Sequence, residues 1–251
     1  MSPITRLFNK REEIDPEKIG LCSSIIFIDA GARCGELYKN NDSGEFIGTF
    51  FELSTDEKSL NVRTDLGAHA PNAFKPWPFK INRKNFTNCE FHLFEPNPEF
   101  FEKLCQVAKH ISSATGPIYV HRMAVSNKYL NGIDFHLTEG GWGSTLKEDK
   151  LHEHFTDSIP VKVIDFVDFV AQLQTRGSTE EIHIKLDIEG SEYDVLPSLF
   201  PRFPKSLKSL SVEFHRDQFP EQDKKFWKDC NFACFNIISM GCHFNWWPGE
   251  W

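Results

Sequence analysis

Short runs of apolar, often β-branched residues alternate along the chain with stretches of helical periodicity. The runs that predict strands lie at residues 25–30, 90–95, 118–125, 181–187 and 208–214. Between them, amphipathic patterns predict one helix from Asn97 to about His110 and another from Asp165 to about Gln174. Strands that alternate with helices are typical of a mostly parallel sheet with helices on both faces. We therefore expect an α/β fold.

Two further regions predict antiparallel pairs. Residues 133–138 have the pattern of one hairpin arm next to the glycine-rich stretch 140–143. Near the C-terminus, the apolar stretches 235–240 and 243–247 predict an antiparallel pair at the edge of the sheet.

The connection between the first two predicted strands is unusually long. Residues at about 37–89 contain prolines and aromatic residues, as in Lys75–Phe79, and long connections in compact domains are usually functional or disordered. We interpret this segment as an ordered insertion that forms a lid or a substrate wall. The predicted organisation is an N-terminal extension at 1–24 and a single domain at 25–251 that carries the insertion.

Composition narrows the class of protein. The 251 residues, 40% hydrophobic and 25% charged, suit one α/β domain, and the net charge of −8 makes nucleic acid an unlikely partner. No run approaches the ~20 apolar residues of a membrane helix, and residues 1–20 lack the apolar core of a signal peptide. The seven cysteines form no C-x-x-C pair, which favours a reducing compartment over a zinc site or a disulfide framework. We therefore expect a cytoplasmic protein.

The first predicted strand leads into a turn with the residues of a ligand site. Asp29 ends the strand, and Gly31 and Gly35 follow it, so the backbone there can approach a ligand closely. The turn lacks the three-glycine spacing of a dinucleotide fingerprint, which weakens a nicotinamide-dependent oxidoreductase as an interpretation.

The fourth predicted strand ends in crowded carboxylates. Asp187, Glu189 and Glu192 surround Gly190. Carboxylates this close repel one another unless they meet a cation or a hydrogen-bonding ligand, so the segment indicates a functional site.

Together the two segments resemble a known family. Residues 29–35 resemble the D-x-G-x-x-x-G motif of class I S-adenosylmethionine-dependent methyltransferases, and residues 185–192, with the pattern K-x-D-x-E-G-x-E, resemble the FkbM methyltransferases. Four further segments fit the family in order: residues 91–98, 124–127, 140–146 and 211–215. The resemblance implies a Rossmann-like class I methyltransferase fold, with a mostly parallel seven-stranded sheet and an antiparallel last strand. It also implies S-adenosyl-L-methionine as the cofactor.

The resemblance assigns roles to particular residues. Those implied to bind the cofactor are Asp29, Gly31 and Gly35 for its methionine portion, Glu95 for the ribose, Ser126 and Asn127 for the adenine, and Asp187 near the methyl group. Pro96 and Glu189 are expected to contact the cofactor as well, and Ser144 either contacts its carboxylate or caps a helix. Glu52 is an alternative ribose-binding acid, because it lies nearer the spacing of about 20 residues expected after a glycine turn.

The acceptor side is expected to contain Asp187, Glu213 and His215, with His215 as the base if the acceptor is a hydroxyl. These residues and Glu189 also offer oxygen and imidazole ligands for a divalent ion. We expect no metal, because the resemblance does not imply one.

The sequence thus predicts a methyltransferase that acts on a hydroxyl of a small molecule, sugar or glycan. The alternative is a catalytically silent protein that keeps the fold as a binding module. The acceptor and the oligomeric state have no signal in the sequence.

Overall fold

The computed structural model describes residues 25–32, 38–39, 46–47, 51–53, 59–62, 80–82, 89–111, 116–139, 143–151, 154–176, 179–203 and 205–248. The predicted N-terminal extension at 1–24 and the predicted cofactor residue Gly35 lie outside these ranges.

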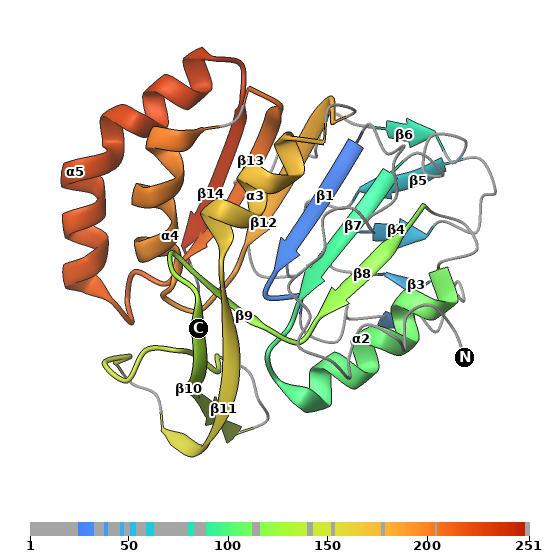
Figure 1. Ribbon diagram of the computed structural model, residues 1–251. Helices are drawn as coiled ribbons and strands as arrows, with labels where there is room; N and C mark the ends of the chain where they lie inside the picture. Colours follow the sequence, from blue (N-terminus) through green and yellow to red (C-terminus); the bar gives the residue numbers. More distant parts are fainter. Residues whose placement is uncertain are drawn as a thin grey trace.

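The central sheet has six strands in the order β14-β13-β12-β1-β7-β8 (Figure 1). They are β1 (Ile25–Ala30), β7 (Cys89–Phe94), β8 (Ile118–His121), β12 (Glu181–Leu186), β13 (Leu207–Phe214) and β14 (His243–Pro248). All neighbouring strands are parallel. The strand β1 lies in the middle, and the chain proceeds from it in one direction to β7 and β8 and in the other to β12, β13 and β14. Ligands bind outside the carboxyl ends of the strands at such a switch point.

The sequence predicted seven strands with an antiparallel last strand. The described sheet instead contains six strands, and its last strand is parallel. The apolar residues at 235–240 predicted a strand, but Pro220–Ser239 form the continuous helix α5. Its buried residues Cys230, Cys234 and Ile237 follow a helical period, whereas Phe235 is 72% exposed. A helix of this length spans about 30 Å and returns the chain to the end of the sheet at which the parallel strands begin. The strand β14 therefore runs parallel to β13.

Helices cover both faces of the sheet. They are α2 (Pro98–Ile111), α3 (Phe166–Gln174), α4 (Glu192–Leu199), a short 3₁₀ helix (Phe200–Arg202) and α5. Ile26 and Ile28 of β1 pack in a core with α3, α4 and α5, whereas Phe27 packs in a second core with α2. Because successive strand residues point to opposite faces, α2 covers one face and the other helices cover the opposite one.

Three further strands form a separate sheet in the order β10-β11-β9. They are β9 (Ala124–Ser126), β10 (Leu130–Thr138) and β11 (Phe155–Asp165). The predicted third strand is therefore divided between β8 and β9. The β10–β11 hairpin projects from the end of the central sheet toward which the strand arrows point in Figure 1.

The predicted insertion contains a sheet of its own. Its strands pair antiparallel in chain order and are β2 (Tyr38–Lys39), β3 (Phe46–Ile47), β4 (Phe51–Leu53), β5 (Ser59–Val62) and β6 (Lys80–Asn82). Glu52, the alternative ribose-binding acid, lies on β4 and pairs with Ile47 and Asn61 rather than with a strand of the central sheet.

None of the helices in the described part of the chain is long and apolar enough to cross a membrane.

Candidate active site

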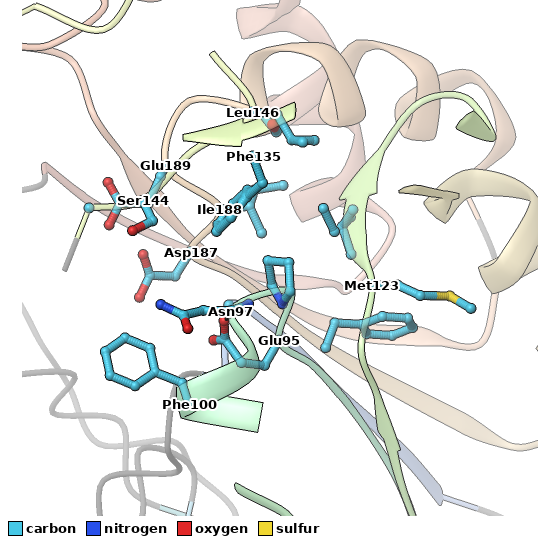
Figure 2. A pocket seen from close by; sticks show the side chains of 17 residues that line it. Glu95, Asn97, Phe100, Met123, Phe135, Ser144, Leu146, Asp187, Ile188 and Glu189 are labelled. Atoms are coloured by element: carbon cyan, nitrogen blue, oxygen red, sulfur yellow. Dashed lines mark hydrogen bonds between the residues drawn. The ribbon is translucent and has the colours of Figure 1, made fainter. Parts of the chain in front are cut away.

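A cavity opens at the carboxyl ends of β1, β7 and β12. It encloses about 530 Å³ of empty space, part of which is open to solvent. Asn97, Asp187 and Glu189 lie toward one side of it, the apolar side chain of Met123 lies toward the other, and Phe135 lies beside Ile188 (Figure 2). A pocket that combines an apolar wall with a few convergent polar groups is the usual form of a small-molecule site.

The turn after β1 contributes backbone to this cavity. Gly31 has a φ of +84°, which favours glycine, and a Cβ there would lie 1.7 Å from the carbonyl oxygen of Asp187. Its N–H and that of Ala32 both donate to the carbonyl of Phe94 on β7. The turn is therefore held between the ends of β7 and β12, and only glycine fits.

Glu95 and Asn97 form the wall next to this turn. The N–H of Asn97 donates to Glu95 Oε1 (2.8 Å), and Asn97 Oδ1 accepts from the N–H of Glu99 in the first turn of α2 (3.0 Å). Glu95 is 4% exposed. Its carboxylate is thus fixed in orientation at the cavity, at the point where a strand passes into a helix.

The segment after β10 is joined to the turn after β12. Thr145 Oγ1 donates to the carbonyl of Glu189 (2.5 Å), and Lys150 Nζ donates to Glu189 Oε2 (2.9 Å) and to the carbonyl of Gly143 (2.7 Å). Glu189 has a φ of +52°, which is uncommon for a residue other than glycine. These contacts hold Glu189 in that conformation, and strained residues of this kind concentrate at functional sites.

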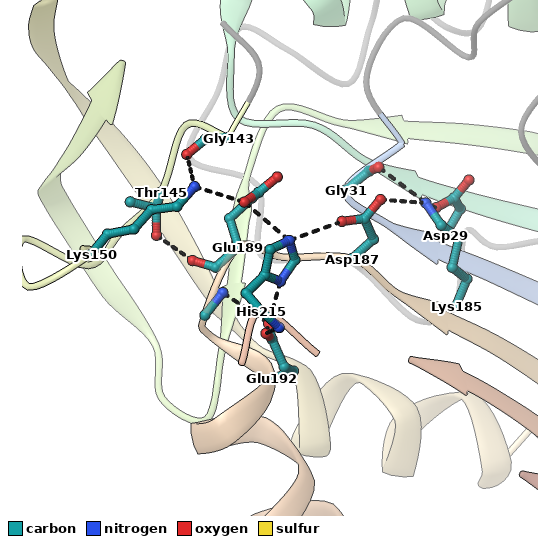
Figure 3. A network of polar contacts seen from close by, with 11 residues as sticks. Asp29, Gly31, Gly143, Thr145, Lys150, Lys185, Asp187, Glu189, Glu192 and His215 are labelled. Atoms are coloured by element: carbon teal, nitrogen blue, oxygen red, sulfur yellow. Dashed lines mark hydrogen bonds and ion pairs between the residues drawn. The ribbon is translucent and has the colours of Figure 1, made fainter. Parts of the chain in front are cut away.

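His215, which follows β13, lies among three carboxylates of the segment that leads from β12 into α4 (Figure 3). Its Nδ1 lies 3.0 Å from Glu192 Oε1, and its Nε2 lies 3.1 Å from Glu189 Oε2 and 3.9 Å from Asp187 Oδ1. Asp187 Oδ2 in turn lies 3.3 Å from Lys185 Nζ, which also donates to Asp29 Oδ1 (3.2 Å). A continuous set of charged contacts therefore connects the end of β13 with the end of β1.

The sequence of residues 65–246 matches the Methyltransferase FkbM domain. This match covers most of the chain. The chain belongs to the FkbM methyltransferase family. The protein is accordingly a methyltransferase with a Rossmann-like fold. No match was found among curated proteins or among solved structures.

The family match begins after β1, so it does not include the Asp29–Gly31 motif. The structure nevertheless pairs β1 with both β7 and β12, which lie within the match, and brings Gly31 against Asp187. The first motif of this FkbM methyltransferase thus joins the rest of the site through space, across the insertion that separates it in sequence.

The charges in this network lower the pKa of Glu189 and raise the pKa of His215. Burial alone would raise the pKa of Glu189, but the charges of His215 and Lys150 hold it well below its usual range. Burial alone would lower the pKa of His215, but Glu189 and Glu192 raise it well above the ordinary value. Burial and the charge of Asp187 raise the pKa of Glu213 to about 8.

The predicted site residues occupy three different places. Those that line the cavity are Gly31, Glu95, Pro96, Ser144, Asp187 and Glu189. Glu213 and His215 lie next to Asp187 but do not line the cavity. Asp29 lies behind the Gly31 turn, where it is 3% exposed and contacts Lys185.

Ser126 and Asn127 do not line the cavity. Ser126 donates to Asn127 Oδ1, and Asn127 Nδ2 donates to Ser198 Oγ on α4, each at 3.4 Å. The residues just before them, Met123 to Val125, contribute to the cavity instead.

Sequence reasoning missed two residues that organise the site. Lys185 alternates with apolar neighbours, a pattern that predicts a partly solvated face, but it is 1% exposed and bridges Asp29 and Asp187. Lys150 lies in a run of charged residues that is typical of a solvated surface, yet its side chain is fully buried. The alternation of Lys185 with apolar neighbours was a usable signal for the first, whereas no local pattern marks the second.

Proposed function

We propose that this FkbM methyltransferase uses S-adenosyl-L-methionine to methylate a hydroxyl oxygen of a small molecule, sugar or glycan. The observation that carries the proposal is the meeting of Gly31, Glu95 and Asp187 at one cavity. They come from the ends of three neighbouring strands, β1, β7 and β12, at the switch point of the sheet.

The cavity suits the parts of this cofactor. The Gly31 turn offers backbone with no side chain in the way, and the fixed Glu95 carboxylate is an acceptor for a pair of ribose hydroxyls. Val125, Phe135 and Ile188 provide apolar surface for a flat base. S-adenosylmethionine supplies an electrophilic methyl group on a sulfonium. Holding donor and acceptor in line is the main contribution that the protein makes to such a displacement.

Asp187 is the residue best placed to receive the acceptor's proton. It lines the cavity, whereas His215 is 1% exposed and lies behind it. Glu189 and Glu192 raise the pKa of His215, so in the metal-free protein its imidazole keeps a proton at neutral pH and does not accept another. We therefore assign His215 to the positioning of Asp187, and we assign contact with the acceptor to Asp187 itself.

Calorimetric titration with S-adenosylhomocysteine and with NAD tests the cofactor. We expect the first to bind and the second not to bind. Glu95→Gln removes charge-assisted hydrogen bonds to the ribose and should weaken S-adenosylhomocysteine binding by about 10- to 100-fold. Glu102→Gln, an exposed substitution on α2, is the matched control and should leave the affinity unchanged.

Incubation with S-adenosylmethionine and a panel of hydroxylated small molecules, sugars and amines tests the reaction. Methylated products confined to the hydroxylated acceptors would support transfer to oxygen, and methylated amines would contradict it. Binding of the cofactor without any product would instead favour the silent binding protein.

A further inference from the structure

Two carboxylates and an imidazole converge at the carboxyl ends of β12 and β13. Asp187, Glu213 and His215 each place one ligand atom within 4.8 Å of the other two. His215 is buried, and the two acids are partly buried. This set of oxygen and nitrogen donors suits a divalent first-row cation such as Mn²⁺.

The imidazole of His215 is oriented for such a role. Glu192 Oε1 lies 3.0 Å from Nδ1 and accepts the backbone N–H of His215, so the proton of this contact lies on Nδ1. Nε2 is buried and meets no acceptor in good hydrogen-bond geometry within the described residues, although Glu189 Oε2 lies 3.1 Å away. A metal-binding histidine usually donates one ring N–H to a carboxylate, which orients the ring so that the other nitrogen faces the metal ligands.

Glu189 is the carboxylate that lies nearest to Nε2 of His215. Its Oε2 lies 3.1 Å from His215 Nε2, and Asp187 Oδ1 lies 3.9 Å from the same nitrogen. A divalent cation held by Nε2, Asp187 and Glu213 would offset the negative charge of these crowded carboxylates.

We propose that Asp187, Glu213 and His215 bind a divalent cation, with Glu192 orienting the imidazole and Asp187 shared between the cation and the cavity wall. The binding site stands on the geometry of these side chains and does not depend on methyl transfer. If both proposals hold, a hydroxyl beside the cation would have a lowered pKa, which favours an acceptor oxygen.

The decisive variant is Glu213→Gln. It removes one ligand and also the repulsion between Glu213 and Asp187, so the metal-free variant should unfold at the same or a higher temperature than the wild type. Asp217→Asn, an exposed substitution close to His215 in the chain, is the matched control.

The full chain, treated with EDTA and dialysed, is titrated with MnCl₂ while free Mn²⁺ is measured by electron paramagnetic resonance. We expect the wild type and Asp217→Asn to bind one Mn²⁺, and Glu213→Gln to bind it at least 10-fold more weakly. The spin-echo modulation of a directly bound imidazole nitrogen should be present in the wild type and absent in His215→Gln.

Absence of stoichiometric binding in the wild type would overturn the proposal. Equal affinity in the wild type and Glu213→Gln, or no nitrogen modulation in the wild type, would overturn it as well, because the ion would then lie elsewhere. S-adenosylhomocysteine affinity measured on the same samples separates the two proposals. Cofactor binding without Mn²⁺ would refute only the metal site, and Mn²⁺ binding without cofactor would refute only the methyltransferase site proposed above.

Discussion

The backbone of Gly31 lies against the backbone of Asp187, so closely that a Cβ at position 31 would come within 1.7 Å of the Asp187 carbonyl oxygen. The N–H of Asp187 also donates to the carbonyl of Ala30 (3.0 Å). Two segments separated by more than 150 residues in the sequence therefore form one backbone surface at the base of the cavity.

Gly31→Ala should destabilise the protein by about 3 kcal/mol. The left-handed conformation costs a residue with a side chain about 1–2 kcal/mol, and displacement of the Asp187 backbone adds a further cost of the same order. Gly132→Ala is the control, because Gly132 also has a positive φ (+69°) but nothing lies within 4 Å of its Cβ position. Urea unfolding should show a loss of about 1 kcal/mol for the control, and equal losses in the two variants would contradict the packing argument.

Local patterns were sufficient to place the main strands and two helices. The predicted strand at 25–30 coincides with β1, and the helix predicted from Asp165 to about Gln174 coincides with α3, which Asp165 caps by accepting from the N–H of Asp168. These predictions succeeded because each depends on residues adjacent in sequence. The strand β11 was missed, although Ile159, Val161 and Val163 alternate with more exposed residues along it.

The parts that failed depend on contacts between distant segments. Whether the last strand is parallel depends on the crossover through α5, and the apolar run near its end does not distinguish a helix from a strand. The acids of the site were identified from the sequence, but their partners Lys150 and Lys185 were not. Pairing between β12 and β1 brings Lys185 to Asp29, and no spacing in the sequence reports that contact.

Lys185→Met should destabilise the protein by about 3–5 kcal/mol, because it leaves the buried Asp29 carboxylate without its ammonium partner. The double variant Asp29→Asn/Lys185→Met should recover part of this loss, since it removes both charges. Lys225→Met is the control, because Lys225 forms an exposed pair with Asp229 and should give no measurable change in urea unfolding. A double variant that is less stable than Lys185→Met would contradict this account.

Lys150→Met should weaken S-adenosylhomocysteine binding about 10-fold, which corresponds to the loss of one charge-assisted interaction. The substitution removes the ammonium that joins the Glu189 carboxylate to the carbonyl of Gly143, so the cavity wall that contains Ser144 and Glu189 loses part of its support. Lys147→Met, which removes a more exposed pair with Asp194, serves as the comparison in calorimetric titration. Equal effects of the two substitutions would show that the Lys150 contacts do not shape the cavity.

The buried His183 should make the protein less stable as the pH falls below about 6.5. Burial lowers its pKa to about 4, so between these values the unfolded chain binds a proton that the folded protein does not. The stabilisation is complete above the unfolded pKa and is lost progressively toward pH 4, to a total of about 2–3 kcal/mol.

His183→Gln keeps a hydrogen-bonding group near Ser209 Oγ but does not titrate. The difference in unfolding free energy between wild type and variant should therefore shrink or reverse from pH 7 to pH 4.5 in urea titrations. A difference that stays constant with pH would show that His183 is not the group responsible, and the exposed substitution His154→Gln is the control variant measured alongside.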